Sequence, residues 1–222
     1  MRWLGNNLDL VAGRAWSHLA LAVPAILATL VVSLPIGWLA NRLRWSRAVL
    51  LAVAGLLYAI PSLPLFVLLP SLIGTGVRDR LNVVVALTLY GMALMIRAVA
   101  EGLDTVGGEV IDAATAMGLG PVSRFLRVDL PLAGPVLLAG LRVVSLSTIS
   151  LVTVSAVLGV PSLGLLFVDG FQRGLVAEVV AGIVATVALA LAVDGLLVLV
   201  GRWLMPWTGL AARPRPTAKQ PA

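Results

Sequence analysis

The sequence lacks cysteine and holds a single histidine, and charged residues make up only 12% of its 222 residues. Without cysteine there is no disulfide and no thiolate chemistry for metal binding or redox reactions. His18 and the scattered carboxylates form no constellation of the kind that holds a metal or performs acid–base catalysis. A Gly-rich phosphate loop ending in Gly-Lys-Ser or Gly-Lys-Thr is also missing. These absences argue against an enzyme and give the sequence no site for ATP hydrolysis.

Apolar residues dominate the composition instead. They make up 60% of the chain, whereas an average soluble domain is about 45 to 50% apolar, so a soluble fold could not bury them. They gather in long uncharged runs, one of them interrupted only by Asp194. Because a helix of about 20 apolar residues crosses a bilayer core of about 30 Å, the runs predict an all-α polytopic membrane bundle with five transmembrane helices. The predicted spans are residues 19–40, 48–73, 81–100, 132–158 and 178–204, within a membrane domain of residues 19–208.

The two ends of the chain differ from these spans. Residues 1–18 mix aromatic and aliphatic side chains with polar ones, which predicts a short amphipathic segment at the outer membrane interface. Residues 209–222 hold three prolines and three basic residues, which predicts a disordered cytoplasmic tail.

The basic residues indicate the orientation of the chain. A net charge of +6 would suggest a nucleic-acid partner for a soluble protein, but here the basic residues cluster at the ends of the apolar runs. With the N-terminus outside, the inner segments carry ten basic residues and the outer segments five. Since cytoplasmic loops are enriched in Lys and Arg, we predict that the N-terminus lies outside and the C-terminus in the cytoplasm. No nucleic-acid partner is expected.

The second apolar run is rich in proline. Each proline removes a backbone donor and bends a helix, so the run is predicted to break near Ile60-Pro61. Interrupted helices line the pathway in many transporters, yet proline is also ordinary in membrane helices. Both interpretations stay open, and the pathway candidates are Pro61, Ser62 and Pro64.

Residues 101–131 form the only long polar stretch between spans, and they hold five of the ten acidic residues. A helical period places Val110, Ala113, Ala114 and Met117 on one face of a short helix. This helix is too short and too polar to span a membrane. It is either an amphipathic segment on the membrane surface or a docking element whose small residues let another protein approach closely.

The ends of this short helix carry recognisable signals. Glu109 and Asp112 lie in its first turns, where the helix dipole favours negative charge. Gly118 is placed to end it in a left-handed conformation, and Pro121 is suited to begin a second short helix.

A resemblance decides between these alternatives. The pattern Asp112-Ala113-Ala114, three residues, Gly118, nine residues, Val128-Asp129-Leu130-Pro131 resembles the EAA motif of binding-protein-dependent ABC importer permeases. That motif reads Glu-Ala-Ala, three residues, Gly, nine residues, Ile, any residue, Leu-Pro. Here Asp112 replaces the Glu and Val128 replaces the Ile. The resemblance implies that this loop couples the permease to an ATPase. The implied coupling residues are Glu109, Asp112, Ala113, Ala114, Gly118, Leu130 and Pro131.

Other segments resemble the osmoprotectant branch of these permeases, which imports glycine betaine, choline or carnitine. They are residues 60–66, Arg97, residues 126–135 and residues 139–142. Ala98 stands where the branch usually has Asn, and residues 159–164 replace its Gly-rich turn. The resemblance covers residues 20–208, nearly the whole membrane domain.

The resemblance implies the fold of type I importer permeases, similar to that of the methionine importer, in the inner membrane of a prokaryote. The expected partners are two cytoplasmic ATPase subunits that bind ATP and Mg²⁺, a second permease that is identical or homologous, an external substrate-binding protein, and membrane lipid. The runner-up function is a secondary transporter or channel driven by gradients, for which midplane charges would mark the coupling site.

Arg142 and Asp194 are the two ionisable residues placed well within predicted spans. Arg142 lies eleven residues after Pro131 and Asp194 eight residues before Arg202, so both lie about 12 to 17 Å from the cytoplasmic face. We therefore predict an ion pair, with a gating role as the alternative, because unpaired charges are costly in a membrane. His18 is predicted at the outer end of the first span, in an interfacial or solvated setting.

Overall fold

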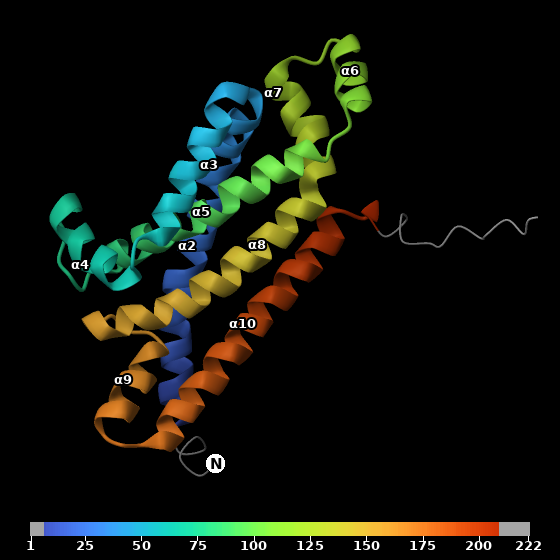
Figure 1. Cartoon of the computed structure of the whole chain (residues 1–222). Coiled ribbons are helices and arrows are strands. Elements are labelled where there is room, and N and C mark those ends of the chain that lie inside the picture. The colour runs from blue at the N-terminus through green and yellow to red at the C-terminus, as the bar shows by residue number, and fades with distance from the viewer. Residues whose placement is uncertain (1–6, 209–222) are drawn as a thin grey trace, which may run out of the picture.

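The computed structural model describes residues 7–208, and all regular secondary structure among them is helical. Figure 1 shows long helices that run between two ends of the molecule, with α6 and α7 at one end and α9 at the other. The elements in chain order are α2 (Leu8–Arg42), α3 (Arg44–Ala59), α4 (Ser62–Ile73), α5 (Arg80–Asp104), α6 (Gly108–Ala116), α7 (Pro121–Arg124), the π-helical turn η1 (Phe125–Asp129), α8 (Leu130–Val152), the 3-10 segment η2 (Thr153–Leu158), α9 (Gly164–Gln172) and α10 (Val176–Leu204).

Four continuous helical stretches are long and apolar enough to cross a membrane, and the bent pair α3 and α4 makes a fifth if it counts as one span. This confirms an all-α membrane bundle. The first helix is longer than the predicted span 19–40, because α2 runs from Leu8 to Arg42 and residues 8–18 are continuous with it. Residues 1–6 and the predicted tail, residues 209–222, lie outside the described residues.

The predicted break at Ile60-Pro61 is confirmed. α3 ends at Ala59 and α4 begins at Ser62, and the two helices are bent by 103°. Because Pro64 has no backbone N–H, the Ile60 carbonyl loses its helical donor. The Tyr90 hydroxyl of α5 donates to that carbonyl at 2.5 Å instead. A side chain from a neighbouring helix therefore stabilises the corner.

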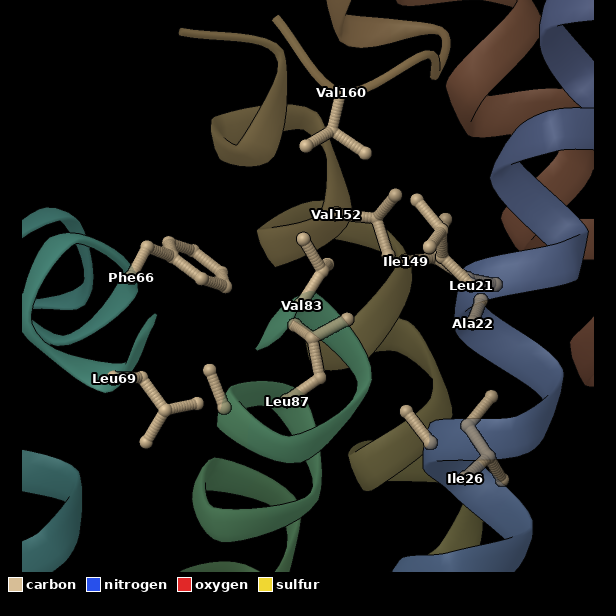
Figure 2. Close-up of a cluster of buried hydrophobic side chains, with 12 residues drawn as sticks. Leu21, Ala22, Ile26, Phe66, Leu69, Val83, Leu87, Ile149, Val152 and Val160 are labelled. Carbon is tan, nitrogen blue, oxygen red and sulfur yellow. The ribbon is translucent and has the colours of Figure 1, made fainter. Parts of the chain in front are cut away.

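The half of the core nearer to α4 and α9 joins four segments. Phe66 of α4, Val83 of α5, Leu21 of α2 and Ile149 of α8 belong to one buried cluster (Figure 2). A second cluster lies nearer to α6 and includes Phe125 of η1. Both clusters contain residues of α2, α5 and α8, so these three helices form the centre of the bundle.

The seam between α2 and α5 depends on small residues. A Cβ atom on Gly91 would lie 2.4 Å from Thr29 Oγ1. One on Gly37 would lie 2.5 Å from the Val99 side chain. Both distances are shorter than any atom contact allows, so glycine lets the two backbones approach closely, as at many membrane helix interfaces.

The fourth span ends differently from its prediction of residues 132–158. α8 ends at Val152, the 3-10 segment η2 follows, and Gly159 has a φ of +80°. This left-handed residue turns the chain. The separate short helix α9 follows, which was not among the predicted spans. His18 is also not interfacial as predicted. It is buried, with Nε2 3.0 Å from the Ile149 carbonyl, because α2 packs against α8 at this level.

Candidate functional site

The polar loop contains a separate short helix, α6, which stands apart from the bundle at one end of the molecule (Figure 1). Glu109 lies in its first turn. Gly118 has a φ of +83°, the left-handed conformation predicted for it, and no atom lies within 4 Å of the position where a Cβ would stand. The Leu119 amide donates to the Ala114 carbonyl at 3.2 Å across this turn. Glycine is needed here for its backbone angle and not for space.

The two alanines of the motif face different ways. Ala114 is 1% exposed, whereas Ala113 is exposed. Successive helical residues lie about 100° apart, and Ala114 lies with Ile111 on the side of α6 that faces the bundle. The prediction of one docking face made by both alanines is therefore wrong. The outer surface of α6 instead carries Ala113 with Val110 and Met117, and Glu109 and Asp112 are exposed beside them.

A continuous chain of elements connects α6 with the bundle. Pro121 begins α7, as predicted, and η1 leads directly into α8 at Leu130-Pro131. Phe125 of η1 packs on Trp38 of α2, with ring centroids 5.4 Å apart. Arg124 Nε lies 3.3 Å from Asp129 Oδ2. α6 is thus connected to α8 through the backbone and, through Phe125, to α2 by an aromatic contact.

A cavity of about 370 Å³ separates α6 from the bundle. Its walls include Trp38 of α2, Ile111 and Thr115 of α6, and Arg124 and Asp129 below the turn. Within the described residues, Asp129 Oδ1 is buried and has no hydrogen-bond partner. α6 therefore rests on the bundle through few contacts, which leaves it room to move.

The structure brings together the two charges of the predicted pair. Arg142 Nε lies 2.6 Å from Asp194 Oδ1, and the second guanidinium nitrogen lies 2.8 Å from Asp194 Oδ2. This two-pronged geometry is the strongest form of an Arg–carboxylate contact. The Arg142 side chain is 42% exposed and that of Asp194 is 17% exposed. The pair joins α8 to α10 at mid-membrane depth.

The pathway candidates lie at the corner between α3 and α4. Pro61 and Pro64 are exposed and Ser62 is half-buried. Sequence reasoning did not single out Tyr58, which is 48% exposed beside this corner, or its partner Tyr90. The two rings meet edge to face with centroids 6.2 Å apart. No sequence signal links the two tyrosines, because the packing of α3 on α5 brings them together.

Comparison with known proteins identifies the family. Residues 33–206 match the family described as "Binding-protein-dependent transport system inner membrane component". The chain belongs to this family. It is 30% identical over 200 residues to the osmoprotectant import permease OsmW of Salmonella typhimurium, covering 89% of this chain and 93% of that one. It is 24% identical to the choline transport permease OpuBB of Bacillus subtilis, covering 93% of this chain and 94% of that one.

Two further comparisons agree. The glycine betaine/proline betaine permease ProW of Escherichia coli is 31% identical over 194 residues, covering 85% of this chain and 53% of ProW. The fold matches the methionine ABC transporter MetNI in an inward-facing conformation, with a TM-score of 0.77 and 21% identity, covering 90% of this chain and 98% of that one.

These findings show an ABC importer permease of the osmoprotectant branch. It is an inner-membrane transport component and not an enzyme, and ATP hydrolysis belongs to a separate subunit. Family membership decides against a gradient-driven secondary transporter or channel.

Proposed function

We propose that this permease forms part of the pathway for a quaternary-ammonium osmoprotectant such as glycine betaine, choline or carnitine. It works with two cytoplasmic ATPase subunits that bind ATP and Mg²⁺, a second permease that is identical or homologous, and an external binding protein. The names of the relatives support this cargo class, since osmoprotectant, choline, glycine betaine and carnitine permeases all occur among them.

The coupling element of the proposal is the loop of residues 101–131. The observation that carries it is the position of α6, a helix that stands outside the bundle and is joined to α8 through Gly118, α7 and η1. The Ala113 side of α6 docks on the ATPase, where its small side chain permits close approach. Glu109 and Asp112 are exposed for polar contacts. Leu130 and Pro131 then pass the movement to α8.

Two substitutions test this coupling role. Ala113→Glu adds bulk and charge to the exposed face, and Gly118→Val places a branched residue at a φ of +83°, which such residues rarely adopt. Both changes should abolish cargo uptake and the ATP hydrolysis that loaded binding protein stimulates. Gly120→Ala is the control, because Gly120 has a negative φ and open space around it.

The measurements are uptake into proteoliposomes and ATPase activity of the purified complex. Normal coupled activity in both variants, with the ATPase still bound, would show that α6 is not the coupling element. Ala114→Glu is unsuitable here, because Ala114 is buried and its substitution would disturb the fold of the loop itself.

The proposal places the N-terminus outside and the C-terminus in the cytoplasm. Because the sequence has no cysteine, single cysteines report sidedness without background. Val77→Cys, in the exposed turn before α5, should react with an impermeant thiol reagent in intact cells, and Thr217→Cys should react only after permeabilisation. The reverse pattern would invert the topology.

Arg142 and Asp194 have a structural role in this proposal, holding α10 on α8. The corner at Pro61, Ser62 and Pro64 faces the pathway. Its prolines keep the backbone bent, and Pro61 and Pro64 are exposed there.

A further inference from the structure

α5 carries a charged residue inside the apolar layer. Arg97 lies seven residues before Asp104, which places it about 10 Å from the α6 end of the helix. α5 has 25 residues and is about 37 Å long, so only a few Å extend beyond each side of a core of about 30 Å. Arg97, which the sequence count placed among the inner basic residues, therefore lies within the apolar layer, toward its α6 side.

Arg97 is also poorly placed to reach the cytoplasm. Cα–Cβ bonds of a helix tilt toward its N-terminus, and the N-terminus of α5 lies at the outer side. The side chain thus leaves the backbone toward the membrane centre. Arg97 is exposed, and none of the four ion pairs found among residues 7–208 involves it.

Two other faces of α5 are occupied by neighbouring helices. Gly91 and Val99 meet α2, and Ala98 meets Gly140 of α8. A helical period places Arg97 away from both contacts.

The remaining face holds Tyr90, Leu94, Arg97 and Glu101 at positions i, i+4, i+7 and i+11. It adjoins the corner between α3 and α4, because Tyr90 bonds the Ile60 carbonyl there. A guanidinium directed at lipid from this face would be costly. α3 packs on part of this face, where Tyr90 is buried and Arg47 pairs with Asp104, whereas Arg97 is exposed.

We propose that Arg97 is a cargo-binding residue of the translocation pathway, which binds the carboxylate of a zwitterionic quaternary amine while Tyr58 receives its ammonium group. The proposal rests on the proposed cargo class. Arg forms two parallel hydrogen bonds with a carboxylate, and an aromatic face attracts a quaternary ammonium. Glycine betaine and carnitine carry both groups, whereas choline has no carboxylate.

The positions of the tyrosines fit this assignment. Tyr58 is exposed and its ring meets the edge of Tyr90, whose hydroxyl is fixed on the Ile60 carbonyl. Tyr90 and Arg97 are two helical turns apart, about 10 Å along the axis. Because the Arg97 side chain tilts toward the N-terminus, its guanidinium lies closer to the tyrosines than this axial separation, at a distance comparable to the length of a small zwitterion.

The first test compares cargoes in proteoliposomes that hold the complete importer. Arg97→Gln should lower glycine betaine uptake by at least about tenfold, the loss of one charge-assisted contact, and leave choline uptake within about twofold. Arg97→Lys should keep part of the glycine betaine uptake because it keeps the charge. Arg80→Gln, at the outer end of the same helix, is the matched control and should change neither. Equal losses for both cargoes, or no loss, would overturn the assignment.

A second test needs no cargo. In a Leu94→Cys chain, reaction rates are measured with a sulfonate-bearing and a trimethylammonium-bearing methanethiosulfonate. Adding Arg97→Gln should slow the anionic reagent and speed the cationic one, each by roughly threefold or more for one charge about 6 Å away. Leu191→Cys, on the exposed side of α10, is the control that should react with neither.

The two tests separate the two proposals. Unchanged reagent rates would overturn the role of Arg97 even if wild-type protein imports quaternary amines. A wild-type complex that imports no quaternary amine, yet shows the expected rates at Leu94→Cys, would overturn the cargo class and support an anion-binding Arg97. Co-purification of the ATPase with each variant verifies that the complex is assembled.

Discussion

α5 and α10 look alike in sequence and differ in the structure. Their most apolar 18-residue windows have mean hydropathies of 2.0 and 2.6. Within the chain, 56% of the α5 window is buried and none of the α10 window is. Hydropathy thus predicts that both helices enter the membrane but not where they stand in the bundle, because lipid and protein interior are equally apolar.

The two helices are also held by different contacts. α5 packs between α2 and α8 along glycine-lined seams, whereas α10 packs on α8 and α9 from the edge of the bundle and meets α2 less closely. Gly201 lies against Leu138 of α8, and Gly182 lies against Phe167 of α9. Asp194 adds the ion pair with Arg142. The ion pair is the one charged contact among those that hold α10 on α8 in the described part of the chain.

The largest expected effect comes from breaking the attachment of α10. Arg142→Met or Asp194→Leu leaves one charge without its partner in the membrane, so each should lower the yield of folded complex several-fold. The double change should be milder, because it removes both charges. Yield is measured by size-exclusion chromatography of the detergent-solubilised complex.

The charge-reversed pair, Arg142→Asp with Asp194→Arg, is the control and should recover part of the yield. If the double change Arg142→Met with Asp194→Leu loses as much as the two single changes added together, the residues are not coupled.

A smaller effect is expected at the seam of α5. Gly91→Ala puts a Cβ 2.4 Å from Thr29 Oγ1, and such overpacking costs about 1 to 3 kcal/mol. Gly195→Ala on α10 meets no atom within 4 Å and should be neutral or slightly stabilising. Thermal unfolding in detergent compares the two. Thr29→Ala should rescue Gly91→Ala, and equal effects at Gly91 and Gly195 would refute the contrast between the helices.

The smallest effect concerns the support that α5 gives to the bent corner. Tyr90→Phe removes the donor to the Ile60 carbonyl and should cost about 1 kcal/mol. Tyr58→Phe, whose exposed ring sits beside it, should cost less. The same thermal unfolding experiment measures both changes. A loss at Tyr58 as large as that at Tyr90 would speak against a special role for this hydrogen bond.

Features set by local chemistry could be predicted from the sequence. The break at Ile60-Pro61 follows from missing donors, and the conformation of Gly118 follows from its place after a short helix. The pairing of Arg142 with Asp194 could be inferred from depth along two antiparallel helices, since a charge in a membrane needs a partner.

Features set by packing could not be predicted. The burial of Ala114 depends on which side of α6 faces the bundle, and periodicity alone gives no direction. His18 is buried because α2 packs against α8 at Ile149, a contact that no local pattern reveals. The contact of Tyr58 with Tyr90 depends on how α3 packs against α5, which no local sequence pattern specifies.

The Arg142–Asp194 pair also has a consequence for the synthesis of the protein. The chain emerges N-terminus first, so Arg142 in α8 enters the membrane well before Asp194 in α10 exists. Until the last helix arrives, α8 carries an unmatched guanidinium. The ion pair can therefore form only after α10 has been inserted. We expect a chain that stops before Val176 to be degraded rapidly in pulse-chase experiments, and Arg142→Met to slow the degradation of that fragment.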